Sequence, residues 1–113
     1  MRISTSYTID MRLLTLPLVF DWDEGNLRKN SKKHNVGMQE AEQIFFNKPL
    51  LLSDTNLHST SEKRYKALGK TNDNRELLAI FTLRNNKLRV ISIRDMSRRE
   101  RREYENTQEN PNV

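Results

Sequence analysis

The feature that most constrains the fold is a pair of apolar stretches joined by two asparagines, within residues 75–95. Asparagine tolerates the positive φ angles of a two-residue hairpin turn, so Asn85-Asn86 predicts a tight turn between two antiparallel strands. Residues 75–84 are apolar on both faces, which is typical of a strand inside a sheet. We therefore expect residues 75–84 to form the central strand, with residues 87–95 paired beside them.

Two further segments have the pattern of strands. Residues 64–70 lead into the polar turn 71–74, which connects them to the central strand. Residues 13–22 mix apolar side chains with Pro17, which indicates a short strand at the edge of the sheet. Residues 53–62 lack periodicity and are predicted to be a loop. The sheet should therefore have three to four strands.

Helices are predicted before and after these strands. Residues 23–34 begin with acidic and end with basic side chains, as the helix dipole favours, and residues 38–46 show the spacing of a buried helical stripe. Ser97 and Glu100 form a capping box that starts a helix ending near Asn106. The predicted fold class is α+β, with two N-terminal helices, an antiparallel sheet and a C-terminal helix.

The chain of 113 residues is long enough for one small domain. We expect this domain to span residues 20–106. Residues 1–19 are interpreted as a leader or an alternative start, with either Met1 or Met11 as the native initiator. Residues 107–113 are expected to form a disordered tail.

Charge and composition narrow the classes of function. The formal net charge is +5, which favours anionic partners such as nucleic acid, an acidic protein or a membrane surface. There is no cysteine, which excludes disulfides and is typical of the cytoplasm. With only His34 and His58, we expect no metal site and no cofactor. No run approaches the roughly 18 apolar residues of a membrane span.

Arginines are dense in residues 89–106, and they fall into two groups. Those of the predicted helix alternate with glutamates, which favours a solvated face of ion pairs along the helix. The possible pairs are Arg99 with Glu103 and Arg101 with Glu105. Arg89 and Arg94, on the predicted strand, have only Asp95 nearby to neutralise them, so they carry the functional hypothesis.

Several short motifs, in this order, resemble the BrnT family of bacterial toxins. The motifs cover roughly residues 20–104 and are Phe20-Asp21-Trp22-Asp23-Glu24, Asn26, Lys33-His34-Asn35-Val36, Ala41, Glu62-x-Arg64, Leu68-Gly69, Arg89-Val90-Ile91-Ser92-Ile93-Arg94, Arg98, Glu100 and Tyr104. Asn35 stands where the family usually has glycine, and it can adopt the same backbone geometry. The resemblance implies a RelE-like fold.

The resemblance also implies a function. BrnT proteins are toxins of type II toxin–antitoxin pairs, so this chain would be a metal-independent endoribonuclease that inhibits translation and growth. A BrnA-like antitoxin would neutralise it and would bring it to operator DNA. The alternatives are a non-enzymatic module that binds nucleic acid or a partner, such as a degenerate toxin, and a purely structural scaffold.

Candidate site residues follow from the resemblance together with the chemistry of RNA cleavage. The ribose 2′-hydroxyl must lose a proton, cations must stabilise the charge on phosphorus, and an acid must protonate the leaving oxygen. Guanidinium groups stay ionised and match phosphate oxygens in pairs. The candidate catalytic residues are Glu62, Arg64, Arg89, Arg94 and His34. The candidate RNA-binding residues are Lys33, Tyr65, Ser92 and Tyr104, whose aromatic members could stack on bases.

Each candidate also has a structural interpretation. His34 could cap a helix, Glu62 could form an ordinary ion pair with Arg64, and Tyr104 could pack against the sheet. Arg89 and Arg94 are five positions apart, so strict alternation would place them on opposite faces unless a bulge intervenes.

Overall fold

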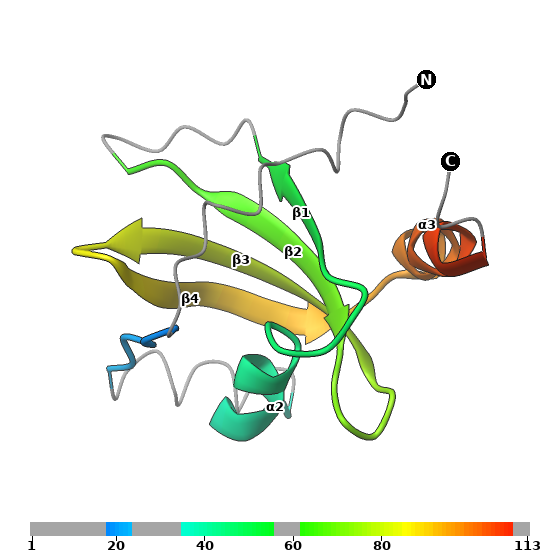
Figure 1. Ribbon diagram of the computed structural model, residues 1–113, viewed down its shortest axis with the longest axis horizontal. Helices are drawn as coiled ribbons and strands as arrows, with labels where there is room; N and C mark the ends of the chain where they lie inside the picture. The colour runs from blue at the N-terminus through cyan, green and yellow to red at the C-terminus, as the bar shows by residue number, and fades with distance from the viewer. Residues whose placement is uncertain (1–17, 24–34, 56–61, 110–113) are drawn as a thin grey trace.

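The computed structural model describes residues 18–23, 35–55 and 62–109. Within them, four strands form one antiparallel sheet in the order β1-β2-β3-β4, accompanied by two helices (Figure 1). The elements are α2 (Met38–Gln43), β1 (Leu51–Asp54), β2 (Tyr65–Lys70), β3 (Glu76–Arg84), β4 (Lys87–Asp95) and α3 (Arg98–Glu109). The fold class is therefore α+β, as the sequence predicts.

The hairpin of β3 and β4 forms where the sequence places it. Asn85 and Asn86 connect the two strands and have φ angles of 51° and 66°, in the left-handed region that asparagine tolerates. β3 lies inside the sheet, between β2 and β4. The predicted hairpin and the internal position of its first strand are both confirmed.

A β-bulge in β4 changes the direction of its side chains. Ile80 pairs with Ser92 and Phe81 pairs with Val90, so Ile91 is an extra residue between the two registers. Leu88, Val90 and Ile93 consequently belong to the same buried cluster, although regular alternation would separate Ile93 from the other two. Arg89 and Arg94 alternate with these residues, so the bulge places both arginines on the opposite face.

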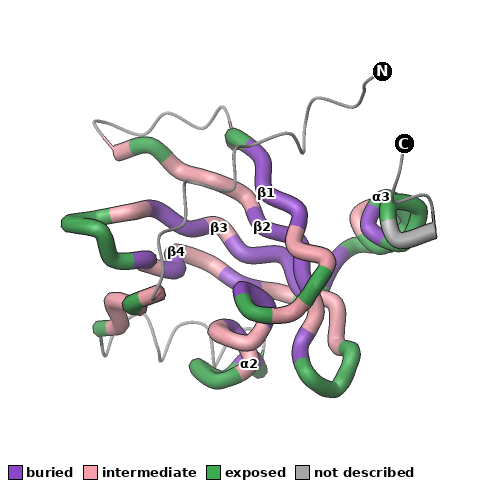
Figure 2. Tube along the Cα trace, in the orientation of Figure 1, coloured by how far each residue is buried: buried purple, intermediate pink, exposed green. Residues whose placement is uncertain are grey.

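The two faces of the sheet pack against different elements, and buried positions run along all four strands (Figure 2). α2 and the turn that follows it cover one face, where Ala41, Ile44 and Phe45 share a core with apolar residues of every strand. That cluster comprises Val36, Ala41, Ile44, Phe45, Leu52, Ala67, Leu77, Ala79, Phe81, Leu88, Val90 and Ile93. The smaller cluster on the other face contains Leu51, Leu68, Leu78, Met96 and Tyr104.

α3 is fixed to the sheet by the ring of Tyr104 and by ion pairs, of which Arg94–Glu100 lies at its start. Tyr104 is fully buried, and its hydroxyl donates a hydrogen bond of 2.7 Å to the carbonyl oxygen of Pro49. The predicted capping box is present, because the Ser97 amide donates to Glu100 Oε1 and the Glu100 amide donates to Ser97 Oγ. Arg94 also binds both oxygens of Glu100, at 2.8 and 2.9 Å. The start of α3 is thus tied to the end of β4.

Several element boundaries differ from those predicted. β1 was not expected, because its four residues are too few to show a period and its pairing with β2 is a tertiary interaction. α2 ends at Gln43 and continues as turns, whereas residues 38–46 were predicted to be helical. α3 extends to Glu109, so it includes three residues that the sequence assigned to the tail. The predicted helix 23–34 lies almost entirely outside the described residues.

The predicted strand 13–22 is only partly described, and its described part forms a single bridge. Phe20 pairs in parallel with Leu88 on β4. The Asp21 amide donates to the Leu88 carbonyl, and the Leu88 amide donates to the Val19 carbonyl, each at 2.8 Å. The segment therefore lies along the outer edge of β4 without forming a regular strand.

Gly69 allows α2 and β2 to approach closely. A Cβ atom on Gly69 would lie 2.8 Å from the carbonyl oxygen of Ile44 and 3.0 Å from the Ile44 Cβ. Ile44 is fully buried, and its backbone follows directly after α2. The C-terminal end of α2 can therefore pack on the sheet only where β2 has no side chain.

We expect Gly69→Ala to lower the free energy of unfolding by about 1–3 kcal/mol, because the added methyl group forces backbone atoms apart. Urea unfolding followed by circular dichroism would measure this change. Gly37→Ala is the matched control, since a Cβ at Gly37 meets no atom within 4 Å. Equal effects of the two substitutions would contradict the packing argument.

The Arg94–Glu100 pair should make stability depend on pH. The hydrogen bonds from Arg94, helped by the Ser97 amide, lower the pKa of Glu100 from 4.5 to about 2. The stabilisation is therefore complete above about pH 4.5 and is lost as the pH falls towards 2. Glu100→Gln removes the ion pair and should lower the free energy of unfolding at neutral pH. The loss should be only about 1 kcal/mol, because solvent screens part of the pair. Urea unfolding from pH 7 to about pH 2 should show the difference shrinking, and a difference as large at pH 2 as at pH 7 would contradict this account.

Candidate functional site

Three arginines gather at the end of the sheet that carries the β3–β4 turn, opposite the end that leads into α3 (Figure 1). Arg64 directly precedes β2, Arg84 is the last residue of β3, and Arg89 is the third residue of β4. They lie together because antiparallel pairing brings the start of β2, the end of β3 and the start of β4 to the same end of the sheet. With Asp21, Asp23 and Glu62, these residues form what we call the arginine–carboxylate cluster.

Glu62 and Arg84 form a two-point ion pair in this cluster. The Arg84 Nε and Nη2 atoms donate to the two carboxylate oxygens of Glu62, with Nη2 lying 3.1 Å from Oε1. The Glu62 side chain is 24% exposed and that of Arg84 is 46% exposed. Paired contacts of this kind fix the plane of the carboxylate as well as its position.

The surroundings of Glu62 keep its carboxylate ionised. The hydrogen bond from Arg84 is the main cause that lowers the pKa of Glu62, and the positive charges of Arg64 and Arg89 act in the same direction. Partial burial opposes this effect without overcoming it. Glu62 is therefore a carboxylate held among three guanidinium groups, able to accept a proton and unable to donate one at neutral pH.

Arg89 is held by the segment that runs along the edge of β4. Its Nη2 atom contacts Asp23, and its Nη1 atom lies 3.5 Å from Asp21 Oδ2. The Arg89 side chain is 19% exposed. The bridge between Phe20 and Leu88 aligns the two chains, so Asp21 lies next to Arg89. The same two aspartates raise the pKa of Arg84, after the larger effect of Glu62.

Arg64 differs from the other two arginines. Its Nε atom is buried and has no hydrogen-bond partner among the described residues. Leaving a buried donor unsatisfied costs about 1–3 kcal/mol, and more for a charged group. Arg64 is thus a cation whose charge acts on Glu62 and whose Nε donor is buried and unsatisfied among the described residues.

The other predicted site residues lie elsewhere. Arg94 is bound to Glu100 near the start of α3, roughly 15 Å along β4 from Arg89. Tyr104 is fully buried, so its ring presents no face for a base. Ser92 is partly buried on β4 opposite Ile80. Lys33 and His34 lie outside the described residues.

Tyr65 remains accessible on one side. Its ring centroid lies 5.5 Å from that of Phe81, and Lys63 Nζ lies 5.6 Å from the Tyr65 ring centroid. Tyr65 faces the α2 side of the sheet, because it pairs with Phe81 of that core. A base stacked on Tyr65 would therefore lie on the face of the sheet opposite to the one that carries Arg89.

The sequence expectation about the partners of Arg89 and Arg94 needs correction. Arg89 and Arg94 were expected to lack carboxylate partners other than Asp95, yet Asp21, Asp23 and Glu100 bind them. These partners are 6 to 68 residues away along the chain, so local sequence does not reveal them. The bulge that would bring both arginines to one face is present.

Arg101 is also paired differently from the expectation. Arg101 Nε lies 3.0 Å from Glu76 Oε1 on β3, whereas Glu105 was expected to be its partner. This ion pair helps to hold α3 against the sheet.

Arg84 was missed by sequence reasoning. A signal was available, since the predicted hairpin turn at Asn85-Asn86 already placed position 84 beside residue 87 and near the start of the preceding strand.

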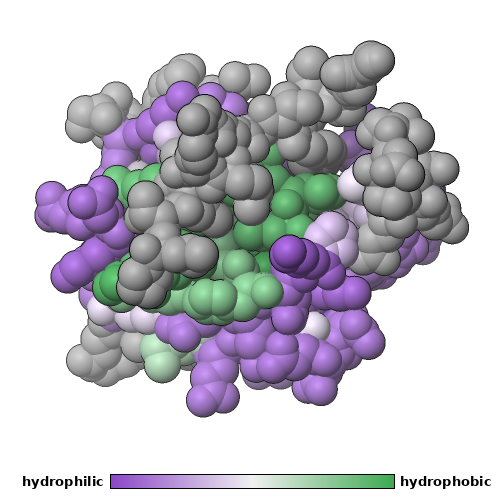
Figure 3. Space-filling model, in the orientation of Figure 1, coloured by the Kyte–Doolittle hydropathy of each residue, from purple (hydrophilic) through white to green (hydrophobic). Residues whose placement is uncertain are grey.

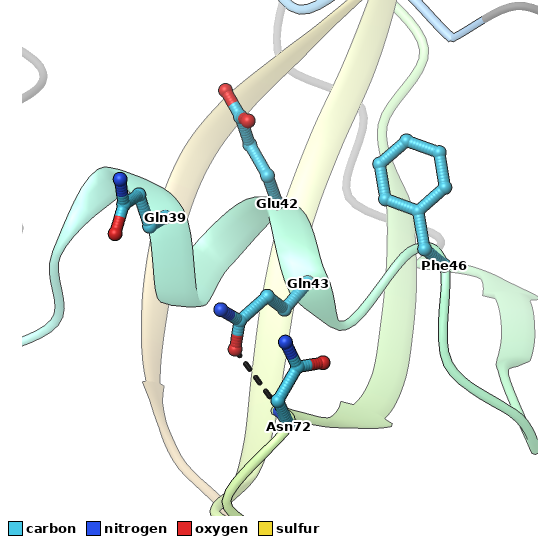
Figure 4. A pocket seen from close by; sticks show the side chains of 5 residues that line it. All are labelled: Gln39, Glu42, Gln43, Phe46 and Asn72. Carbon is cyan, nitrogen blue, oxygen red and sulfur yellow. Dashed lines mark hydrogen bonds between the residues drawn. The ribbon is translucent and has the colours of Figure 1, made fainter.

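A hollow beside α2 is the other candidate site, and its lining differs from the arginine–carboxylate cluster. It is lined by Gln39, Glu42, Gln43, Phe46 and Asn72, and the Asn72 amide donates to Gln43 Oε1 at 3.0 Å (Figure 4). The hollow has no cation among its lining residues, and Glu42 would repel a phosphate. Apolar residues gather at the centre of the face in Figure 3, whereas the end with the β3–β4 turn is hydrophilic. The arginine–carboxylate cluster is therefore the better candidate for an anionic substrate.

No three His, Cys, Asp or Glu side chains lie in position to hold a metal ion within residues 18–23, 35–55 and 62–109. None of the helices in that part of the chain has the length and apolar character needed to cross a membrane.

Comparison with known proteins identifies the family. Residues 22–100, more than half of the chain, match the family described as "Ribonuclease toxin, BrnT, of type II toxin-antitoxin system". No protein of curated function matches the chain. The match spans Trp22, all four strands and the start of α3, and so includes the arginines of the cluster. The chain belongs to the BrnT family of ribonuclease toxins from type II toxin–antitoxin systems.

Proposed function

We propose that this toxin cleaves RNA without a metal ion, at the arginine–carboxylate cluster. The observation that carries the proposal is an ionised Glu62 carboxylate that lies among the positive charges of Arg84, Arg64 and Arg89. The arginines would stabilise negative charge on the RNA phosphate, and the carboxylate would accept a proton. The membership of the BrnT family supports ribonuclease activity, and the resemblance supports a RelE-like arrangement of the elements.

In the proposed reaction, Glu62 accepts the proton of the ribose 2′-hydroxyl while that oxygen attacks the adjacent phosphorus. Arg64 and Arg89 stabilise the negative charge that develops on the phosphate oxygens. Phosphate would replace the aspartates that hold Arg89 in the free protein. His34 is the candidate acid for the departing 5′-oxygen. The products are a 2′,3′-cyclic phosphate and a free 5′-hydroxyl, and no atom is needed from a cofactor.

The remaining predicted residues are proposed to have supporting roles. Ser92 and Lys33 are candidates for holding the RNA chain beside the reacting phosphate, and Tyr65 is a candidate for a base that passes round the end of the sheet to its other face. The contacts of Arg94 with Glu100 and the burial of Tyr104 favour structural roles for both residues. Catalysis would then depend on one end of the sheet, and α3 would support it.

Family membership implies an antitoxin partner. We propose that this partner is a BrnA-like protein in the cytoplasm, that it covers the basic surface, and that the complex binds the operator DNA. Free toxin would inhibit translation and stop growth. An alternative is a non-enzymatic module that binds nucleic acid or a partner, favoured by the fact that Arg84 and Arg89 are already paired with carboxylates.

Arg64→Ala and Arg89→Ala should each lower RNA cleavage about 10²–10³-fold, since each removes a contact made to the developing charge. Both variants should also fail to arrest growth. Cleavage of a labelled RNA in the presence of EDTA, together with growth after induction, measures these effects. Arg102→Ala on the exposed side of α3 is the matched control and should remain active. Strand variants that stay fully active while the helix variant is impaired would move the site to α3.

The chain alone should bind operator DNA no more tightly than random DNA of equal length. Its positive charge gives only a sequence-independent attraction, which weakens steeply as salt rises. Mobility shifts with and without the product of a neighbouring antitoxin gene, at 50 and 200 mM salt, measure this. Tight, salt-resistant operator binding without a partner would contradict the assignment of DNA recognition to the antitoxin.

A further inference from the structure

We propose that Arg84 is a positioning residue of the ribonuclease site, which holds the Glu62 carboxylate in a fixed orientation towards the 2′-hydroxyl. This inference rests on the proposed function. It concerns a residue outside the motifs that relate the chain to its family, and it follows from the contacts at the end of the sheet.

The geometry of the ion pair supports positioning. Arg84 uses Nε and Nη2, the two donors on one edge of the guanidinium, to bind both oxygens of Glu62. This arrangement fixes the carboxylate plane, and each oxygen keeps a further lone pair with which it can accept a proton. Arg84 is the last residue of β3, so a strand holds its backbone. The Arg84 and Glu62 side chains are both partly exposed, so a substrate can reach the pair.

The charges around Glu62 define what Arg84 contributes. Arg84 contacts Glu62 from β3, whereas the charges of Arg89 on β4 and of Arg64 before β2 act on it without a contact. Arg84 is the only one of these three that a hydrogen bond joins to Glu62 among the described contacts. Asp21 and Asp23 face Arg84 and Arg89 on the other side. Without Arg84, Glu62 would keep two cations nearby but would lose its orientation.

The acidic limb of the pH–rate profile should shift when Arg84 is removed. Arg84 is the largest cause of the lowered pKa of Glu62, and partial burial acts in the opposite direction. Removal of Arg84 should therefore move the pKa of Glu62 upwards. If Glu62 is the base, activity is lost as the pH falls through its pKa, so the acidic limb should move to higher pH.

The experiment measures kcat and KM for a short labelled RNA across pH 3–9, a range that reaches below the ordinary pKa of a glutamate, for wild type, Arg84→Ala and Arg84→Lys. We expect Arg84→Ala to lower kcat about 10- to 100-fold with little change in KM, and to move the acidic limb to higher pH. Arg84→Lys keeps the charge but loses the paired contact. Compared with Arg84→Ala, it should bring the acidic limb partly back towards the wild-type pH, and it should recover a smaller share of kcat. Lys87→Ala is the matched control, because Lys87 is an exposed cation paired with Arg84 across the same turn.

A double-mutant cycle separates action through Glu62 from a direct contact with RNA. If Arg84 acts through Glu62, adding Arg84→Ala to Glu62→Gln should cost little further activity. Additive losses, or a raised KM with unchanged kcat, would assign Arg84 to phosphate binding and overturn the inference. An unchanged acidic limb would overturn it as well. A wild-type protein that cleaves no RNA would instead overturn the proposed function, and this inference with it.

Discussion

The β-bulge at Ile91 is the constraint on which the rest of the structure depends. It allows Leu88, Val90 and Ile93 to enter one core, where each buried aliphatic side chain contributes about 1.5–3 kcal/mol. Without it, one part of β4 would face the wrong side of the sheet. The arginines of β4 take their direction from the same adjustment. Burial of the apolar residues therefore decides where Arg89 points, and the position of the candidate site is a consequence of packing.

Features encoded by neighbouring residues could be predicted from the sequence. The Asn85-Asn86 turn requires only residues that tolerate positive φ, and the Ser97–Glu100 capping box closes within four residues. β1 could not be found this way, because four residues give no period and the strand exists through its pairing with β2. The pairing of Val19 and Asp21 with Leu88 likewise joins segments that are far apart in the chain.

In the candidate site, too, the residue types could be predicted from the sequence, but their contacts could not. Glu62, Arg64 and Arg89 were recognised as chemically suitable residues, and the structure places them around one end of the sheet. Their partners were not predictable, because ion pairs across strands depend on register and on side-chain direction. Arg84 illustrates this point, since its contact with Glu62 joins residues 22 positions apart. The local charge pattern gave a wrong prediction for β4, because its two arginines form ion pairs with carboxylates on other segments.

The carboxylates that accompany the three arginines also affect how the toxin would sense ionic strength. Free arginines that meet a phosphate backbone release many counterions, which makes affinity fall steeply with salt. Here Asp21, Asp23 and Glu62 already balance three guanidinium charges, so an arriving phosphate would exchange one anion for another. Few ions would be set free. Recognition at this end of the sheet would then depend on short-range hydrogen bonds, and it would persist at salt concentrations that abolish binding to a bare basic patch.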